Sequence, residues 1–146
     1  FVTTTPLNPK TPYTLAKVSL LNSLKLFQNT SNFKYAWCRV FFVYGEGENK
    51  KRLIPYLHEK LSKSEKAIIK NGSLIRDYLE VKEAAKLITK IALNLNSGEF
   101  NICSGKGKSL KNIAIEIGEI YNKKDLIVFE AEDIATFPKK IIGKPN

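Results

Sequence analysis

Apolar residues recur at helical spacing near the start of the chain. Between Pro12 and Phe27 they form one stripe, which consists of Leu15, Val18, Leu21, Leu24 and Phe27. Similar spacing predicts further helices over residues 53–61, 83–95 and 110–121, and Ser109 is the expected N-cap of the last one.

Runs rich in β-branched and aromatic residues separate these predicted helices. They predict strands or extended segments at residues 33–44, 67–69, 74–81, 100–103 and 126–129. The first run has little polar alternation after Arg39, which is typical of a buried strand. Strands that alternate with helices predict an α/β fold with parallel pairing in part.

The composition fits one globular unit. With 146 residues, of which 43% are hydrophobic, the chain can form one modest core, and no segment is typical of a linker. We expect a single α/β unit over residues 1–146. Because the chain begins at Phe1 rather than Met and stops just after a Gly-Lys-Pro turn, we also expect it to be a fragment of a larger protein.

The sequence gives no sign of a membrane segment or a metal site. No apolar run is long enough to cross a bilayer, and no signal-like segment opens the chain. Cys38 and Cys103 stand alone in apolar runs, which is typical of buried thiols in a reducing compartment. His58 is the only histidine, so no His/Cys zinc cluster can form, and we expect it to face solvent. We predict a cytoplasmic protein with no membrane partner and no metal.

The net charge of +10 raises the question of nucleic-acid binding, because clustered Lys and Arg neutralise phosphates. Most lysines here are interleaved with Glu or apolar residues, as in residues 60–66, which is typical of solvated helix faces. We therefore favour a lysine-rich surface without a nucleic-acid partner. A non-catalytic basic module that binds nucleic acid remains the alternative from another functional class.

Tyr13 and Lys17 are the most informative pair in the chain. They follow a proline-containing segment and lie four residues apart, on one face of the first predicted helix. A nearby cation stabilises a phenolate, so such a pair can serve as an acid or base toward an alcohol. The spacing alone is weak evidence, since Tyr56 with Lys60 and Tyr78 with Lys82 share it. We interpret those two as structural.

Two other motifs carry less weight. Residues 104–109 (Ser-Gly-Lys-Gly-Lys-Ser) follow a predicted strand and open a helix, but Ile102 stands where a phosphate-binding P-loop needs its first glycine. Arginine is rare here, and its planar fork can hold a phosphate through two parallel bonds. The structural alternatives are a paired charge for Arg39 and an ion pair with Asp77 or another acid for Arg76.

Several motifs, in one order along the chain, resemble the extended short-chain dehydrogenase/reductase superfamily, and within it the NAD-dependent sugar-nucleotide epimerase/dehydratase group. They are Thr5-Pro6…Pro9…Tyr13-x-x-x-Lys17, Arg39-Val40-Phe41-Phe42-Val43-Tyr44-Gly45, Arg52-Leu53-Ile54-Pro55, Gly72…Arg76-Asp77-Tyr78-x-x-Val81 and Phe100-Asn101-Ile102. Each is weak alone, but the series is specific and selects Tyr13 over Tyr56 and Tyr78.

The resemblance implies the C-terminal part of a Rossmann-type sheet together with a small substrate-binding α/β lobe. It also implies hydride transfer with NAD or NADP, in which Tyr13 is the acid/base and Lys17 holds the ribose. Val40 would border the cofactor. Phe42, Arg52, Ile69 and Arg76 would bind a nucleotide-sugar substrate, the arginines at its diphosphate and Ile69 beside its base.

The chain also departs from the family pattern. The glycine-rich dinucleotide loop is absent, so we expect the fragment alone to be inactive. Phe42 stands where many members have a substrate-binding asparagine, which leaves the substrate and the choice between epimerase, dehydratase and 4-keto-sugar-nucleotide reductase open. A reductase or isomerase of a substrate without a nucleotide is a further alternative, favoured if Arg76 forms an internal ion pair. Family members usually pair through the helix that carries the tyrosine, so the resemblance implies a homodimer of the parent protein.

Overall fold

The computed structural model describes residues 1–130 and 138–146. In these residues the helices are α1 (Pro12–Thr30), α2 (Leu53–Ser62), α3 (Val81–Leu93), α4 (Leu110–Ile120) and the short 3-10 helix η1 (Lys124–Leu126). The strands are β1 (Ala36–Val40), β2 (Phe42–Tyr44), β3 (Ala67–Ile69), β4 (Ile75–Arg76), β5 (Tyr78–Glu80), β6 (Gly98–Ile102), β7 (Lys108–Ser109), β8 (Ile127–Phe129) and β9 (Lys140–Ile141).

The strands pair mainly in parallel, which confirms the predicted α/β fold class. Strand β1 pairs with β6, β2 with β5, and β3 with β8, each in parallel register. Strand β4 lies between antiparallel β7 and parallel β9. Parallel strands cannot be joined by tight hairpins, so helices and loops connect them.

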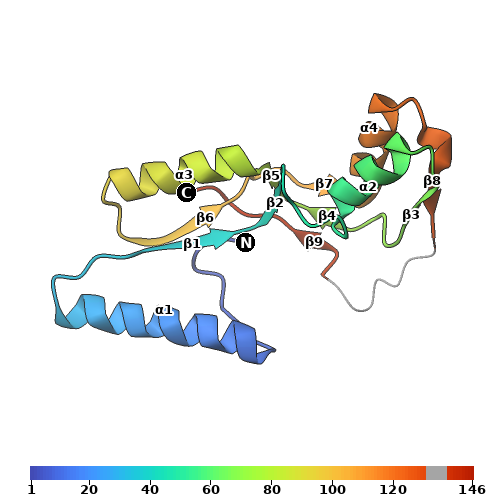
Figure 1. Ribbon diagram of the computed structural model, residues 1–146. Helices are drawn as coiled ribbons and strands as arrows, with labels where there is room; N and C mark the ends of the chain where they lie inside the picture. The colour runs from blue at the N-terminus through green and yellow to red at the C-terminus, as the bar shows by residue number, and fades with distance from the viewer. Residues whose placement is uncertain (131–137) are drawn as a thin grey trace.

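Two groups of elements lie at the two ends of the molecule (Figure 1). At one end, α3 covers one face of the β1–β6 pair and α1 lies on the other side. At the other end, α2 and α4 pack together beside β3 and β8. The short strands β2, β4, β5, β7 and β9 lie between the two groups.

The hydrophobic core fills the end built from α2, α4, β3 and β8. Leu57 and Leu61 of α2 are fully buried against Ile69 of β3 and Ile113 of α4. Burying a Leu or Ile side chain of this kind contributes roughly 1.5–3 kcal/mol. His58, on the same helix, is half-buried rather than solvent-facing as predicted, because its Nδ1 lies 3.1 Å from the hydroxyl of Tyr121.

The predicted strand over residues 33–44 is wrong in one respect, because the structure divides it at Phe41. The amide of Phe41 donates to the carbonyl of Ile102 in β6, whereas the amide of Phe42 donates to the carbonyl of Asp77 beside β5. The chain thus changes partners within one residue. This change separates β1 from β2 and places Phe42 where the two strand pairs meet.

Capping explains where the helices begin. Pro12 occupies the first turn of α1, as the sequence indicates, and the hydroxyl of Thr11, which was not predicted to be a cap, accepts from the amide of Thr14. Helix α3 begins at Val81, two residues earlier than predicted, because the carboxylate of Glu80 accepts from the amides of Lys82 and Glu83.

The remaining differences are small. The two-residue strands β7 and β9 were not predicted. Both cysteines are free thiols; Cys103 is buried as expected, and Cys38 is only half-buried. In the part of the chain that the structure describes, no helix has the length and apolar character to cross a membrane.

Candidate active site

A cavity of about 510 Å³ lies between the segment that leads into α1 and the end of β1. The lead-in contributes Thr5, Pro6, Leu7 and Asn8, and the strand contributes Val40. Apolar walls with a few polar groups are typical of a site for a small organic ligand or a cofactor ring. Three of the predicted site residues line this cavity, namely Val40, Phe42 and Arg52.

Tyr13 and Lys17 lie on the first two turns of α1, just beyond the cavity-lining lead-in. The ammonium of Lys17 lies 5.6 Å from the centroid of the Tyr13 ring, so both side chains occupy one face of the helix, as predicted. The Tyr13 side chain is 71% exposed and does not line the 510 Å³ cavity. The phenol is therefore largely exposed to solvent.

Arg52 is well placed to meet an anion. It is the residue that precedes α2, and its side chain is 67% exposed while it lines the cavity. Its Nε lies 3.6 Å from a carboxylate oxygen of Glu48, which is a long contact for an ion pair. Most of the guanidinium donors thus face solvent or the cavity.

Arg76 is buried, and the structure shows no ion pair between it and Asp77, which was the structural alternative to substrate binding. Its Nη1 donates to the carbonyls of Ile75 and Pro138 at 2.8 and 3.0 Å. Its guanidinium carbon lies 5.6 Å from the centroid of the Phe42 ring, a cation–π arrangement on the wall of the cavity. Burial lowers the pKa of Arg76, and the nearby Tyr78 opposes that shift.

Asp77 holds loops instead of pairing with Arg76. Its fully buried carboxylate accepts from the amides of Ser104, Gly105 and Gly143, at 2.8, 3.0 and 3.1 Å, and from the Ser104 hydroxyl. The loop 104–109 is therefore bound to an acidic side chain, which agrees with our rejection of a P-loop.

Ile69 is not brought together with the other predicted site residues. Its side chain is 2% exposed and packs in the core between α2, α4 and β8. The aromatic residues Phe42 and Tyr78 lie closer to the cavity, with ring centroids 5.6 Å apart. Burial raises the pKa of Tyr78, although the charge of Arg52 opposes the shift.

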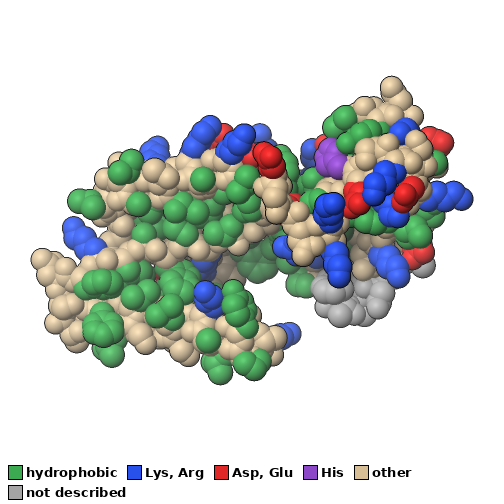
Figure 2. Space-filling view, in the orientation of Figure 1, with side chains coloured by type: hydrophobic (Ala, Val, Ile, Leu, Met, Phe, Trp, Pro, Cys, Tyr) green, Lys and Arg blue, Asp and Glu red, His purple; other side chains and the backbone are tan. Residues whose placement is uncertain are grey.

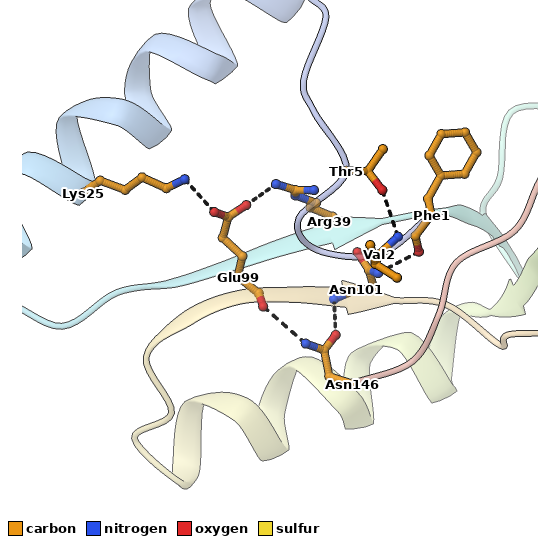
Figure 3. A network of polar contacts seen from close by, with 8 residues as sticks. All are labelled: Phe1, Val2, Thr5, Lys25, Arg39, Glu99, Asn101 and Asn146. Carbon is orange, nitrogen blue, oxygen red and sulfur yellow. Dashed lines mark hydrogen bonds and ion pairs between the residues drawn. The ribbon is translucent and has the colours of Figure 1, made fainter.

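The sequence analysis gave no role to two polar residues here, namely Asn101, which lines the cavity, and Glu99, which pairs with the cavity-lining Arg39. Glu99 forms ion pairs with Arg39 of β1 and Lys25 of α1 (Figure 3). The Asn101 side chain donates to the carbonyls of Phe1 and Lys144 at 3.2 and 3.0 Å. A lone arginine in a buried strand requires an anionic partner, and this was the available signal for Glu99.

The positive charges are dispersed on the face drawn in Figure 2, where Lys and Arg side chains lie over both ends with Asp and Glu among them. Within residues 1–130 and 138–146, no group of three or more His, Cys, Asp or Glu side chains is arranged to hold a metal ion.

Known proteins match this chain over most of its length. Residues 1–103 match the NAD dependent epimerase/dehydratase family. A dTDP-6-deoxy-L-talose 4-dehydrogenase (NAD(+)) of Aggregatibacter actinomycetemcomitans is 29% identical over 126 residues, which is 82% of this chain and 45% of that protein. The chain belongs to the NAD-dependent epimerase/dehydratase family.

Solved structures show the same fold. A dTDP-glucose 4,6-dehydratase from Bacillus anthracis, in complex with NAD, matches 99% of this chain with a TM-score of 0.85 and 22% identity. A UDP-N-acetylglucosamine 4-epimerase from Methanobrevibacter ruminantium matches 94% of it with a TM-score of 0.84 and 24% identity. The chain spans 47% and 46% of those two proteins, so it corresponds to somewhat less than half of each.

Proposed function

We propose that this chain provides the catalytic helix and part of the substrate-binding lobe of an NAD(P)-dependent sugar-nucleotide epimerase or dehydratase. The observation that carries the proposal is the position of Lys17 over Tyr13, at the end of a segment that lines a cavity. Family membership supports it, because it explains why this Tyr-Lys pair follows a proline-containing lead-in. The other Tyr-x-x-x-Lys spacings lack that context.

The reaction would use Tyr13 to move a proton at a sugar hydroxyl while a hydride moves at the same carbon. Lys17 would stabilise the phenolate and hold the cofactor ribose. The nicotinamide supplies the hydride acceptor and donor when it is bound. Pro6, Leu7 and Val40, which line the apolar part of the cavity, would hold its ring, and Asn8 would add a polar group beside them.

The substrate diphosphate would meet Arg52, whose exposed fork can bind phosphate oxygens in pairs. Arg76 would add positive charge from behind Phe42 and fix that ring at the cavity wall. Tyr78 packs against the same ring and would help to hold it. Ile69 would reach the nucleotide base only if its surroundings rearrange, so we assign it no side-chain contact.

A reductase of 4-keto-sugar nucleotides is the second candidate. The dTDP-6-deoxy-L-talose 4-dehydrogenase supports it, because that name describes net oxidation or reduction. Epimerisation and dehydration leave the substrate with no net change of oxidation state, so the cofactor is regenerated in each turnover. A reductase instead consumes one reduced cofactor per product, and the absorbance of the reduced nicotinamide distinguishes the two.

The experiment compares the full-length protein with its Tyr13→Phe variant on UDP-glucose and dTDP-glucose, with products identified by NMR. We expect Tyr13→Phe to lower turnover by about 10²- to 10⁴-fold and to leave the nucleotide-sugar Kd within about threefold. Tyr56→Phe is the matched control, because Tyr56 belongs to another Tyr-x-x-x-Lys spacing and its hydroxyl accepts from the amide of Ile68 at 3.0 Å.

Unchanged turnover in Tyr13→Phe would disprove the catalytic role. If the protein turned over neither sugar nucleotide but bound RNA with an affinity that falls steeply as salt rises, the nucleic-acid alternative would replace the proposal.

A further inference from the structure

Helix α1 is joined to the rest of the described residues with little apolar packing. Leu21 is its one buried residue, whereas Leu15, Leu20, Leu26 and Phe27 are all at least half exposed. A hollow of about 570 Å³ lies between Val18 and Asn22 of the helix and the ends of β1 and β6. Among the described residues, α1 is therefore held mainly by the contacts that cross or border this hollow.

Two polar contacts join α1 to the segment around β6. The ammonium of Lys25 lies 2.7 Å from a carboxylate oxygen of Glu99, and the amide of Gln28 donates to the hydroxyl of Ser97 at 2.8 Å. The first of these involves a largely buried anion, since the Glu99 side chain is 15% exposed. An ion pair at a largely buried carboxylate is less screened by solvent than a surface pair.

Glu99 also pairs with Arg39, so that one carboxylate joins two elements (Figure 3). Burial by itself raises the pKa of Glu99, but the hydrogen bond from Lys25 and the charge of Arg39 outweigh burial and lower it overall. Arg39 lines both the hollow beside α1 and the 510 Å³ cavity. The connection thus runs from the helix to the wall of the candidate active site.

Because α1 is long, a small tilt of the helix at Lys25 displaces Tyr13 by a larger distance. Lys25 follows Tyr13 by twelve residues, which corresponds to about 18 Å along the helix axis. A tilt of about 5° around Lys25 would move the phenol by roughly 1.5 Å. Displacements of about 1 Å can lower the rate of an enzyme by about 10²-fold.

We propose that Glu99 is a positioning residue for the reaction: by binding Lys25 and Arg39 together, it fixes the helix that carries Tyr13 relative to the cavity wall. This inference depends on the proposed function, because it assigns Glu99 to the same site. Asn101, two residues further on the same face of β6, holds the start of the lead-in through the carbonyl of Phe1. Strand β6 would then fix both ends of the segment that presents Tyr13.

The test uses the full-length protein and its Lys25→Gln variant. This substitution breaks the ion pair between α1 and Glu99 but leaves Arg39 paired with Glu99. We expect kcat on UDP-glucose or dTDP-glucose to fall about tenfold with KM within twofold, because the loss lies in orientation and not in binding. Lys25→Arg should restore kcat, since an arginine can reach the same carboxylate. The matched control is Lys124→Gln, which breaks the exposed pair with Glu119 on α4.

Hydrogen exchange of the α1 amides gives a readout that needs no turnover. Exchange in α1 should be faster in Lys25→Gln than in the wild type, and should be unchanged in Lys124→Gln. If Lys25→Gln keeps both the wild-type kcat and the wild-type exchange, the positioning role is wrong.

The failures of the two proposals are distinguishable. If Tyr13→Phe is inactive while Lys25→Gln behaves like the control, only the role of Glu99 fails. If Tyr13→Phe keeps full turnover, the proposed function fails. Faster exchange in Lys25→Gln with an unchanged kcat would show that Glu99 anchors the helix without positioning the reaction, and would also overturn the inference.

Discussion

Lys17 and Tyr13 lie on one face of α1, with the Lys17 ammonium 5.6 Å from the centroid of the Tyr13 ring. No side chain from another element is needed to bring them together, because residues four positions apart on a helix are neighbours. The pair therefore persists wherever α1 forms. Whether the pair can act on a ligand depends on the residues that surround it in the folded protein.

Replacing Lys17 tests the pair itself. We expect Lys17→Met in the full-length protein to lower kcat/KM by roughly 10- to 10²-fold, because the variant lacks the ammonium that we propose holds the cofactor ribose beside Tyr13. Steady-state kinetics on the nucleotide sugar provides the measurement. Lys60→Met, in the second Tyr-x-x-x-Lys spacing, should keep wild-type kinetics, and an equal loss in both variants would contradict the assignment to Lys17.

Replacing Arg52 tests the proposed anion contact. Because the Arg52 fork is exposed at the cavity and only loosely paired with Glu48, its loss should weaken binding of UDP or dTDP about tenfold. Isothermal titration calorimetry measures this change. Lys51→Gln removes a neighbouring charge from outside the cavity lining and should change the Kd less than twofold. Equal effects of the two substitutions would indicate a general effect of charge instead of a specific contact.

The secondary structure was largely predictable, because it depends on local signals. The stripe along α1 and the caps at Thr11 and Ser109 all lie within a few residues of the helices they define. The division of the strand at Phe41 could not be predicted, since it depends on carbonyls of Ile102 and Asp77 that are distant in the sequence.

The candidate site was predictable where motifs are local and unpredictable where partners are distant. Tyr13 and Lys17 follow from spacing, whereas Glu99 lies 60 residues from Arg39 and is one of 14 acidic residues. A sequence alone cannot select among them. The same reason explains why an ion pair with the adjacent Asp77 was the structural alternative for Arg76, although the Asp77 carboxylate binds backbone amides of two remote loops.

Asp77 should be a major contributor to stability. The Asp77 carboxylate is fully buried and accepts from three backbone amides and one hydroxyl. In Asp77→Asn the side-chain NH₂ group would face these donors, and the N–H groups among them cannot accept a hydrogen bond from it. We expect a loss of about 3 kcal/mol in the free energy of unfolding, measured by urea denaturation. Asp125→Asn, on an exposed residue of η1, should change it by less than about 0.5 kcal/mol. A small effect of Asp77→Asn would contradict the anchoring role.

Glu99 should make stability depend on pH in the acidic range. Its pKa in the folded protein is lowered, with burial raising it but the hydrogen bond from Lys25 and the charge of Arg39 prevailing. A lowered carboxyl pKa adds stability that is present above the unfolded-state pKa, about 4.5 for Glu, and is lost as the pH falls through the folded-state value. Wild-type protein should therefore lose stability as the pH falls below about 4.5, measured by urea denaturation at each pH.

Glu99→Gln should be less stable than the wild type at pH 7, because Arg39 then lacks its anion in a largely buried position. The difference in the free energy of unfolding between the wild type and Glu99→Gln should decrease as the pH falls. Protonation of Glu99 removes the same negative charge from the wild type. Glu119→Gln breaks an exposed pair and should follow the wild-type curve at every pH. If the free energy of unfolding of Glu99→Gln differs from that of the wild type by a constant amount from pH 7 to pH 3, the charge of Glu99 does not stabilise the fold. Its contribution would then come from side-chain packing alone.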